Sequence, residues 1–287
     1  MSSPIVTIGL VQMRPEESAE ASLKKAAAMV KEAASKGAQI VALPELFLGP
    51  YFCQRPDDRS AFARAEEIPG PATEALSRLA KECSVVLVGG SLFEKSGSTY
   101  YNTCPVFEAD GTLLGAYRKT HIPEDILYHE QHYFEKGDTG IQVYETSRGK
   151  IAPLVCFDQW FPEAARIAAL QGAQILVYPT AIGVIDGDVE ENVTGDWGQM
   201  WRNAQLGHAA ANNVYVAALN RAGKEGHIAF WGGSFVAAPS SAVIAQGGKG
   251  EEIVMASCDL SRVEALQKAW RFLPNRRPDA YHRLTES

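Results

Sequence analysis

Apolar and polar residues follow two different periods along this chain, and the changes of period divide it into strands and helices. Residues 5–13 (IVTIGLVQM) are rich in β-branched side chains and are bounded by turn-prone residues, which favours a strand. Residues 22–37 (SLKKAAAMVKEAASKG) place apolar side chains at helical spacing, and Gly37 suits the end of that helix. A second apolar stretch follows at 37–47 (GAQIVALPELF). The start of the chain therefore predicts strand, helix, strand.

The same order of elements returns in the second half of the chain. Residues 151–157 (IAPLVCF) read as a strand, 162–172 (PEAARIAALQG) as a helix and 172–183 (GAQILVYPTAIG) as another strand. The tetrapeptide GAQI occurs in both copies, beginning at Gly37 and at Gly172. A unit that appears twice, far apart, predicts two halves of one pseudo-symmetric domain rather than a solenoid.

The remaining pattern adds more strands than helices. Strands are predicted at 83–93, 98–108, 140–152, 212–223, 230–239 and 251–260, and helices at 71–82 and 197–212. Some strands are continuous apolar runs, as expected when both faces are covered, whereas others alternate. This mixture predicts a four-layer α-β-β-α sandwich. Because no Pro/Gly/Ser-rich linker interrupts the chain, residues 1–287 are expected to form a single domain.

The last segment, residues 270–287, departs from this pattern. Its sequence WRFLPNRRPDAYHRLTES carries aromatic residues and paired arginines with little helical period. It could be a disordered end or an arm that packs on a partner subunit. The aromatic side chains favour the arm.

Composition and charge narrow the class of protein. The chain is 46% hydrophobic and 21% charged with a net charge of −7, and it has no long basic run, so neither nucleic acid nor an anionic membrane is an expected partner. Its five cysteines are scattered and form no CxxC pair, which speaks against a disulfide framework and a structural zinc site. The first residues lack a secretory signal pattern, and no apolar run approaches membrane-spanning length. We expect a reducing, cytoplasmic setting.

Several familiar motifs are absent. The chain has no GxGxxG after a strand and no GxxxxGK[ST], so a nucleotide-binding module is disfavoured. The sequence HEQH at 129–132 lacks the HExxH spacing of a zinc-binding helix, and loop histidines with no metal are expected there. His208 and His227 are formal candidates for a catalytic base, although structural roles are commoner for such residues.

One cysteine stands at the junction between a predicted strand and a predicted helix. In PLVCFDQWFPEAAR the apolar run ends at Cys156, and Pro162 opens the helix. A free cysteine often packs as a small hydrophobe. A helix N-terminus, in contrast, favours a thiolate and hence a nucleophile. Position alone leaves both interpretations open.

Three ionisable residues lie in apolar company. Glu45 follows the strand that ends in IVALP, Lys119 lies in LLGAYRKTHIP, and Glu130 stands between Tyr128 and HYF. Buried charges need partners, so a structural Glu–Lys ion pair is one interpretation. The other is chemical: a carboxylate with a raised pKa can accept the thiol proton, and an ammonium can stabilise the oxyanion when the thiolate attacks carbon.

The motifs LPELFLGPYFCQ, YRKTHIP and CFDQWFPE together resemble the Glu–Lys–Cys signatures of the nitrilase superfamily, the carbon–nitrogen hydrolases. The likeness covers nearly the whole chain. It implies the α-β-β-α sandwich, a dimer or higher homo-oligomer that extends it, and no cofactor. It also implies that Glu45 is the base, Lys119 the oxyanion stabiliser and Cys156 the nucleophile, with Glu130 orienting Lys119 or the substrate.

The branch that this chain resembles acts on N-carbamoylputrescine, but two pocket segments depart from it. The chain has EDILYHE where plant members have a Gly-Pro-Gly-Tyr loop, and the loop after PTAIG also differs. The latter, residues 186–196, carries five acidic side chains and no basic one, which suits a cationic tail, although a solvated acidic loop is the alternative. We expect Asp186 to contact the amine, and the other candidate substrate contacts are Tyr51, Trp160, Thr180 and Ala181.

The sequence therefore predicts an enzyme that hydrolyses a small N-carbamoyl amine or amide, with N-carbamoylputrescine as the expected substrate. The alternatives are another amidase, a nitrilase or a ureidopropionase of the same superfamily. A non-catalytic scaffold that uses Glu45 and Lys119 as a structural ion pair is the remaining class.

Overall fold

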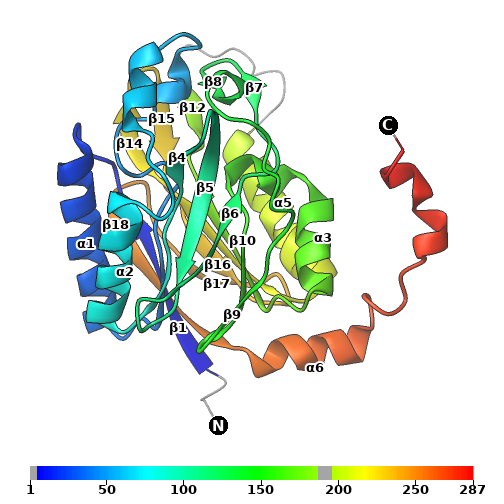
Figure 1. The fold of residues 1–287 in the computed structure, drawn as a ribbon. Helices are drawn as coiled ribbons and strands as arrows, with labels where there is room; N and C mark the ends of the chain where they lie inside the picture. The colour runs from blue at the N-terminus through cyan, green and yellow to red at the C-terminus, as the bar shows by residue number, and fades with distance from the viewer. Residues whose placement is uncertain (1–4, 187–195, 287) are drawn as a thin grey trace.

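Two β-sheets packed face to face form the centre of the molecule (Figure 1). The computed structural model describes residues 5–186 and 196–286. The first sheet runs in the order β18 (Glu252–Asp259), β1 (Ile5–Gln12), β2 (Ile40–Ala42), β3 (Val86–Val88), β5 (Thr99–Phe107) and β4 (Leu92–Ser96), with β6 (Leu113–Arg118) also paired to β5. The second runs β17 (Val243–Gln246), β16 (Phe235–Ala237), β13 (Tyr215–Asn220), β11 (Ile175–Thr180), β10 (Gly149–Pro153) and β9 (Tyr144–Thr146).

Helices cover the outer face of each sheet. On the first sheet these are α1 (Ala19–Ser35) and α2 (Pro71–Cys83), and on the second α3 (Pro162–Leu170) and α5 (Trp197–Asn212) (Figure 1). Buried side chains of both sheets, such as Ile8 of β1 and Val216 of β13, belong to one apolar core. A separate cluster fills the space between the first sheet and its helices. The predicted α-β-β-α sandwich is confirmed.

The two predicted copies of strand, helix, strand are both present. In the first copy β1 and β2 pair in parallel, with Ile8 opposite Ile40, and α1 connects them. In the second copy β10 and β11 pair in parallel, with Ile151 opposite Ile175, and α3 connects them. One copy lies in each sheet, so the repeat corresponds to the two halves of the sandwich.

Several stretches that the sequence predicts as single strands are broken into two. Residues 83–93 form β3 and β4 with Gly89 and Gly90 between them, and Gly90 has a φ of 66°. A Cβ at Gly90 would lie 2.3 Å from the carbonyl oxygen of Pro44. Residues 230–239 are divided in the same way at Gly232 and Gly233. A left-handed residue ends the extended backbone, so apolar period alone overestimates strand length here.

Small elements at one end of the sandwich surround the candidate site. A three-stranded sheet is formed by β12 (Gly183–Ile185), β15 (Ile228–Trp231) and β14 (Ala222–Glu225). A hairpin is formed by β7 (Glu124–Asp125) and β8 (Tyr128–His129), and the 3₁₀ helix η3 (Glu130–His132) follows it directly. The site therefore lies under segments that connect the strands rather than under the strands themselves.

The C-terminal segment extends away from the sandwich. Helix α6 (Ser261–Trp270) leaves the body, and the chain then continues outward through η5 (Pro278–Ala280) and η6 (His282–Leu284) (Figure 1). Large apolar side chains on this segment are exposed, Trp270 at 60% and Leu284 at 66%. None of the helices among the described residues is long and apolar enough to cross a membrane.

Candidate active site

Lys119 lies between two buried glutamates. Its Nζ is 2.8 Å from Oε1 of Glu45 and 2.7 Å from Oε2 of Glu130, and all three side chains are fully buried. Glu45 follows β2, Lys119 follows β6, and Glu130 begins η3. Asn102 of β5 donates a further hydrogen bond to Oε1 of Glu45, at 2.9 Å. Residues of three separate segments thus form one charged cluster, as the resemblance to the nitrilase superfamily implies.

The electrostatics of the cluster keep Lys119 charged. Burial opposes the ammonium form, but Glu130, Glu45 and Cys156 outweigh it and raise the pKa of Lys119 well above its usual value. Burial also raises the pKa of Glu130, to about 6, although Lys119 opposes this shift. Tyr51 supports Glu130 from the other side, because its hydroxyl donates to Oε1 at 2.8 Å.

Cys156 occupies a sharp turn between a strand and a helix. The chain leaves β10 at Pro153, enters the 3₁₀ helix η4 (Cys156–Trp160), and begins α3 at Pro162 as predicted. Cys156 has a φ of 43°, a left-handed conformation that is strained for a residue with a Cβ. Its Sγ lies 3.9 Å from the carbonyl oxygen of Ala181. This turn presents the thiol at the end of the strand.

The surroundings of Cys156 favour the protonated thiol, contrary to what its place before a helix suggests. Burial and then the negative charge of Glu45 raise its pKa well above the usual value, and Lys119 only partly offsets them. A helix terminus exerts a modest effect, whereas desolvation of a fully buried thiolate is large. Oε2 of Glu45 has no hydrogen-bond partner among the described residues, so it is free to accept a proton.

Asp158 connects the segment that carries Cys156 to the segment that carries Lys119. One carboxylate oxygen accepts from the backbone N–H of Val155 at 2.9 Å and from the hydroxyl of Tyr117 at 2.8 Å. The other accepts from the backbone N–H of His121 at 3.0 Å. Sequence reasoning missed this role. The only signal was an acidic residue two positions after the cysteine in an otherwise apolar motif.

Arg221 holds the backbone at Glu45. Its Nη2 donates to the carbonyl oxygens of Glu45 at 2.9 Å and Leu46 at 2.7 Å, while its Nη1 pairs with both carboxylate oxygens of Glu225. Glu225 also accepts from the backbone N–H of Tyr51 at 2.8 Å. Arg221 is fully buried. Sequence reasoning missed it as well, although an arginine directly after the apolar run VYVAALN was a usable signal.

The two histidines considered as bases have other roles. His208 is buried in α5 and hydrogen-bonds through Nε2 to the carbonyl oxygen of Gln159 at 2.7 Å. Burial lowers the pKa of its imidazole. His227 lies at the exposed β14–β15 turn, where its backbone N–H donates to Gln54. Neither is part of the charged cluster.

A cavity of about 100 Å³ opens beside Cys156. Cys156 lines it, whereas Glu45 and Lys119 are fully buried and are not among its lining residues. Neither lysine nor arginine lines the cavity among the described residues, and Asp125 of the β7–β8 hairpin is its one acidic side chain. The lining residues are Pro123, Asp125, Ile126, Tyr128, Cys156, Phe157, Gln159, Trp160, Ala181, Ile182, Gly183, Val184, Ile185 and Trp197.

Of the five residues that the sequence predicts as substrate contacts, two line the cavity and three do not. Trp160 and Ala181 line the cavity. Tyr51 and Thr180 are buried outside its lining, Tyr51 against Glu130 and Thr180 against Gln159. These two residues are 2% and 0% exposed, so neither contacts the cavity in this structure.

Asp186 also lies outside the cavity lining. Its carboxylate is 2.5 Å from Nζ of Lys224 in an exposed ion pair. The rest of the predicted acidic loop, residues 187–195, lies outside the described residues. Asp125, which does line the cavity, was not singled out by sequence reasoning, although it belongs to the unusual segment EDILYHE.

The fold and the sequence define a carbon–nitrogen hydrolase. The profile of the carbon–nitrogen hydrolase family matches residues 7–268, and this chain belongs to that family, within the nitrilase superfamily. It is an amidohydrolase. A crystal structure of a carbon–nitrogen hydrolase from Helicobacter pylori G27 superposes with a TM-score of 0.93 at 38% identity, over 98% of this chain and 99% of that one.

Relatives with different substrates in their names are similar to this chain. N-carbamoylputrescine amidase of Solanum lycopersicum is 41% identical over 96% of this chain and 94% of that protein. Citrullinase of Francisella tularensis is 34% identical over 97% of this chain and 98% of that protein. The comparisons therefore establish the chemistry of the family and leave the substrate as a separate question.

Proposed function

We propose that this protein hydrolyses N-carbamoylputrescine to putrescine, ammonia and carbon dioxide through a covalent intermediate on Cys156. The substrate offers a ureido carbonyl to the thiol and a cationic amine tail to the cavity. The observation that carries the proposal is the charge of the cavity lining. It holds Asp125 as its acidic group and has no lysine or arginine among the described residues.

The first half of the proposed reaction forms a carbamoyl-thioester. Oε2 of Glu45 accepts the thiol proton as Sγ of Cys156 adds to the ureido carbonyl carbon. The ammonium of Lys119 and the backbone N–H of Phe157 stabilise the oxyanion. The C–N bond to the alkyl amine then breaks, and Glu45 returns the proton to the departing putrescine nitrogen.

Hydrolysis of the thioester completes the cycle. Glu45 accepts a proton from water as the water oxygen attacks the carbamoyl carbon, and it returns this proton to the sulfur of Cys156 as the carbon–sulfur bond breaks. The released carbamic acid decomposes to ammonia and carbon dioxide. Glu130 keeps Lys119 in place throughout, because its carboxylate accepts from Nζ at 2.7 Å.

A carboxylate-tailed substrate fits the described lining less well. Proteins commonly bind a carboxylate by the bidentate fork of an arginine. Arg166 follows the nucleophile on α3, but its Nη2 donates to the carbonyl oxygen of Ala211 at 2.9 Å and it does not line the cavity. Citrulline and 3-ureidopropionate both carry a carboxylate, so they are the informative competitors.

The first experiment is ammonia and putrescine release from N-carbamoylputrescine by the wild type and Cys156→Ala. We expect equal amounts of the two products from the wild type and none above background from the variant. The kcat/KM values for citrulline, 3-ureidopropionate, simple amides and nitriles are then compared. A higher kcat/KM for a carboxylate-tailed ureide would reject the substrate while leaving the thiol chemistry intact.

If the folded wild type hydrolysed none of these compounds, N-carbamoylputrescine would be rejected as the substrate and a wider panel of amides would be tested. Circular dichroism of the wild type and of Cys156→Ala provides the control for folding. The cytoplasmic location expected from the sequence stays a prediction.

A further inference from the structure

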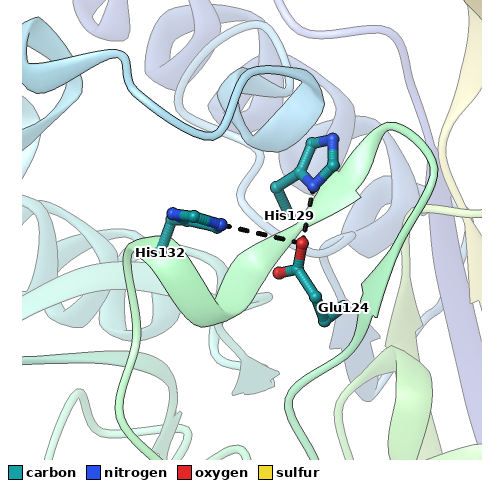
Figure 2. A group of neighbouring side chains, drawn as sticks. All are labelled: Glu124, His129 and His132. Atoms are coloured by element: carbon teal, nitrogen blue, oxygen red, sulfur yellow. Dashed lines mark hydrogen bonds and ion pairs between the residues drawn. The ribbon is translucent and has the colours of Figure 1, made fainter.

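Glu124, His129 and His132 bring three metal-binding side chains together on the segment that also carries the cavity-lining residues Asp125 and Tyr128 (Figure 2). One ligand atom from each lies within 4.8 Å of the other two. Nδ1 of His129 is 2.7 Å from Oε1 of Glu124, and Nε2 of His132 is 3.7 Å from the same oxygen. Both imidazoles point toward one carboxylate oxygen (Figure 2).

The backbone holds these residues in place. Glu124 and His129 face each other across the β7–β8 pair, and Leu127 turns the hairpin with a φ of 62°. His132 follows on η3, whose first residue, Glu130, is fixed by Lys119. The side chain of Gln131 also donates to the carbonyl oxygen of Ile122 at 3.0 Å.

The two distances from the histidine nitrogens to the Glu124 oxygen are close to what a metal ion requires. Zinc binds imidazole nitrogen and carboxylate oxygen at about 2.0–2.2 Å, which places tetrahedral ligands roughly 3.3 Å apart. The two measured distances to the Glu124 oxygen lie on either side of that value. His132 is the most exposed of the three side chains, at 48%, so it can rotate into place without disturbing the core.

We propose that Glu124, His129 and His132 form a binding site for one borderline divalent transition-metal ion, with water in the remaining position. Two imidazoles and one carboxylate suit Zn²⁺ and its neighbours rather than Mg²⁺ or Ca²⁺, which prefer oxygen ligands. The sequence does not reveal this site, because HEQH lacks helical HExxH spacing. The third ligand comes from the opposite strand of the hairpin.

The position of the site gives the ion a physical consequence. Asp125 and Tyr128, which alternate with the ligands along the hairpin, line the cavity beside Cys156. An ion bound to residues of both strands and of η3 holds β7, β8 and η3 together. The ion is thus a brace for the cavity wall and does not touch the reacting atoms.

The simpler alternative is an exposed histidine–glutamate contact, which contributes little to stability and binds no metal. Titration of Zn²⁺ by calorimetry distinguishes the two. The titration uses Cys156→Ala, so that the active-site thiol does not bind the ion, and it is repeated after adding His132→Gln or Glu124→Gln. His282→Gln, an exposed histidine on the C-terminal segment, is the matched control.

We expect one equivalent of Zn²⁺ to bind in the micromolar range to Cys156→Ala. His132→Gln and Glu124→Gln should each weaken binding at least about tenfold, and His282→Gln should leave it unchanged. Co²⁺ in the same site should give visible absorption bands that His132→Gln abolishes. Absence of a stoichiometric binding event, or affinity that survives His132→Gln, overturns the proposal. His132 is half exposed, so its replacement leaves the fold intact.

Discussion

Glu45, Lys119, Glu130 and Cys156 form a set in which each residue alters the protonation of its neighbours. Lys119 lies between both glutamates. Burial and the charge of Glu45 raise the pKa of the Cys156 thiol. Burial thus favours the protonated thiol, and Oε2 of Glu45 has no hydrogen-bond partner among the described residues. In this arrangement transfer of the thiol proton to Glu45 can be coupled to attack on the substrate. This arrangement favours a thiol that loses its proton only as it attacks the substrate, rather than a permanently ionised thiolate.

The raised pKa of Glu130, about 6, predicts an acid limb in the rate profile. Below this pH Glu130 binds a proton, loses its charge and no longer holds Lys119 as an ion pair. We therefore expect kcat/KM to fall as pH decreases through about 6, approaching tenfold per pH unit. Glu130→Gln should be slower at every pH and should lack this limb. Profiles measured from pH 5 to 9 check this.

Glu135→Gln serves as the control for that experiment, since Glu135 is exposed and is near in sequence. Its profile should match the wild type. An unchanged acid limb in Glu130→Gln would assign the limb to another group.

Asp125 predicts how the tail of the substrate is recognised. Because this carboxylate is exposed at the cavity rim, its attraction for an ammonium is screened by water. We expect Asp125→Asn to raise KM for N-carbamoylputrescine roughly two- to fivefold with little change in kcat. The KM for an uncharged alkyl urea should not change. Steady-state kinetics on both substrates provide the measurement.

Asp186→Asn is the matched variant, because Asp186 is an exposed aspartate paired with Lys224 outside the cavity lining. The sequence favours Asp186 as the amine contact, and the structure favours Asp125. A larger rise in KM from Asp186→Asn than from Asp125→Asn would return the assignment to the sequence prediction.

At the scale of elements, the site is held by contacts between segments rather than within them. Asp158 links η4 to the end of β6, and Arg221 links the start of β14 to the residues after β2. Each places a buried side chain against backbone groups of a distant segment. These links keep Glu45 and Cys156 in position although both lie just beyond the ends of their strands.

Arg221→Met tests this arrangement. Losing the guanidinium leaves Glu225 buried without its cation and the carbonyl groups of Glu45 and Leu46 without their donor. We expect the free energy of unfolding to fall by about 3–5 kcal/mol and kcat to fall as well. Urea denaturation and steady-state kinetics measure the two effects.

A second variant separates stability from positioning. Adding Glu225→Leu to Arg221→Met removes the uncompensated charge and should restore much of the stability. It should not restore kcat, because the backbone at Glu45 stays unsupported. Full recovery of kcat in the double variant would contradict a positioning role for Arg221. Arg277→Met, at an exposed ion pair, is the control for loss of an arginine.

At the scale of the whole molecule, much of the C-terminal segment among the described residues is exposed, although Leu273 packs against the core. It extends from the sandwich with Trp270 and Leu284 exposed (Figure 1). We propose that residues 270–287 pack on a second copy of the chain, since exposed apolar side chains of this size usually mark an interface. The arm predicted from the sequence is consistent with this geometry.

Light scattering tests the arm. The full chain should have a mass that is a multiple of 31.1 kDa, and a chain truncated after Trp270 should form a smaller assembly. Leu284→Ser, measured in the same way, is a milder version of this test. A full-length monomer, or an assembly that the truncation leaves unchanged, would contradict the proposal.

Helix positions and the repeat could be read from the chain, whereas strand ends could not. The helices predicted at 71–82 and 197–212 are present almost residue for residue as α2 and α5. The predicted strands continued through Gly90 and Gly232, because the spacing of apolar residues does not reveal where the backbone adopts a left-handed conformation. The spacing of apolar residues is enough to locate a helix, but the path of the chain after a glycine depends on tertiary contacts.

The sequence by itself determined the α-β-β-α class and the repeated strand–helix–strand unit, because these follow from the local period of apolar residues. The grouping of Glu45, Lys119 and Glu130 was implied by the resemblance of three short motifs to the nitrilase superfamily. Only the tertiary structure revealed the burial that raises the pKa of the Cys156 thiol, the contacts of Asp158 and Arg221, and the place of Asp125, rather than Asp186, in the cavity lining. Those depend on burial and on contacts between residues distant in the chain, which no local pattern encodes.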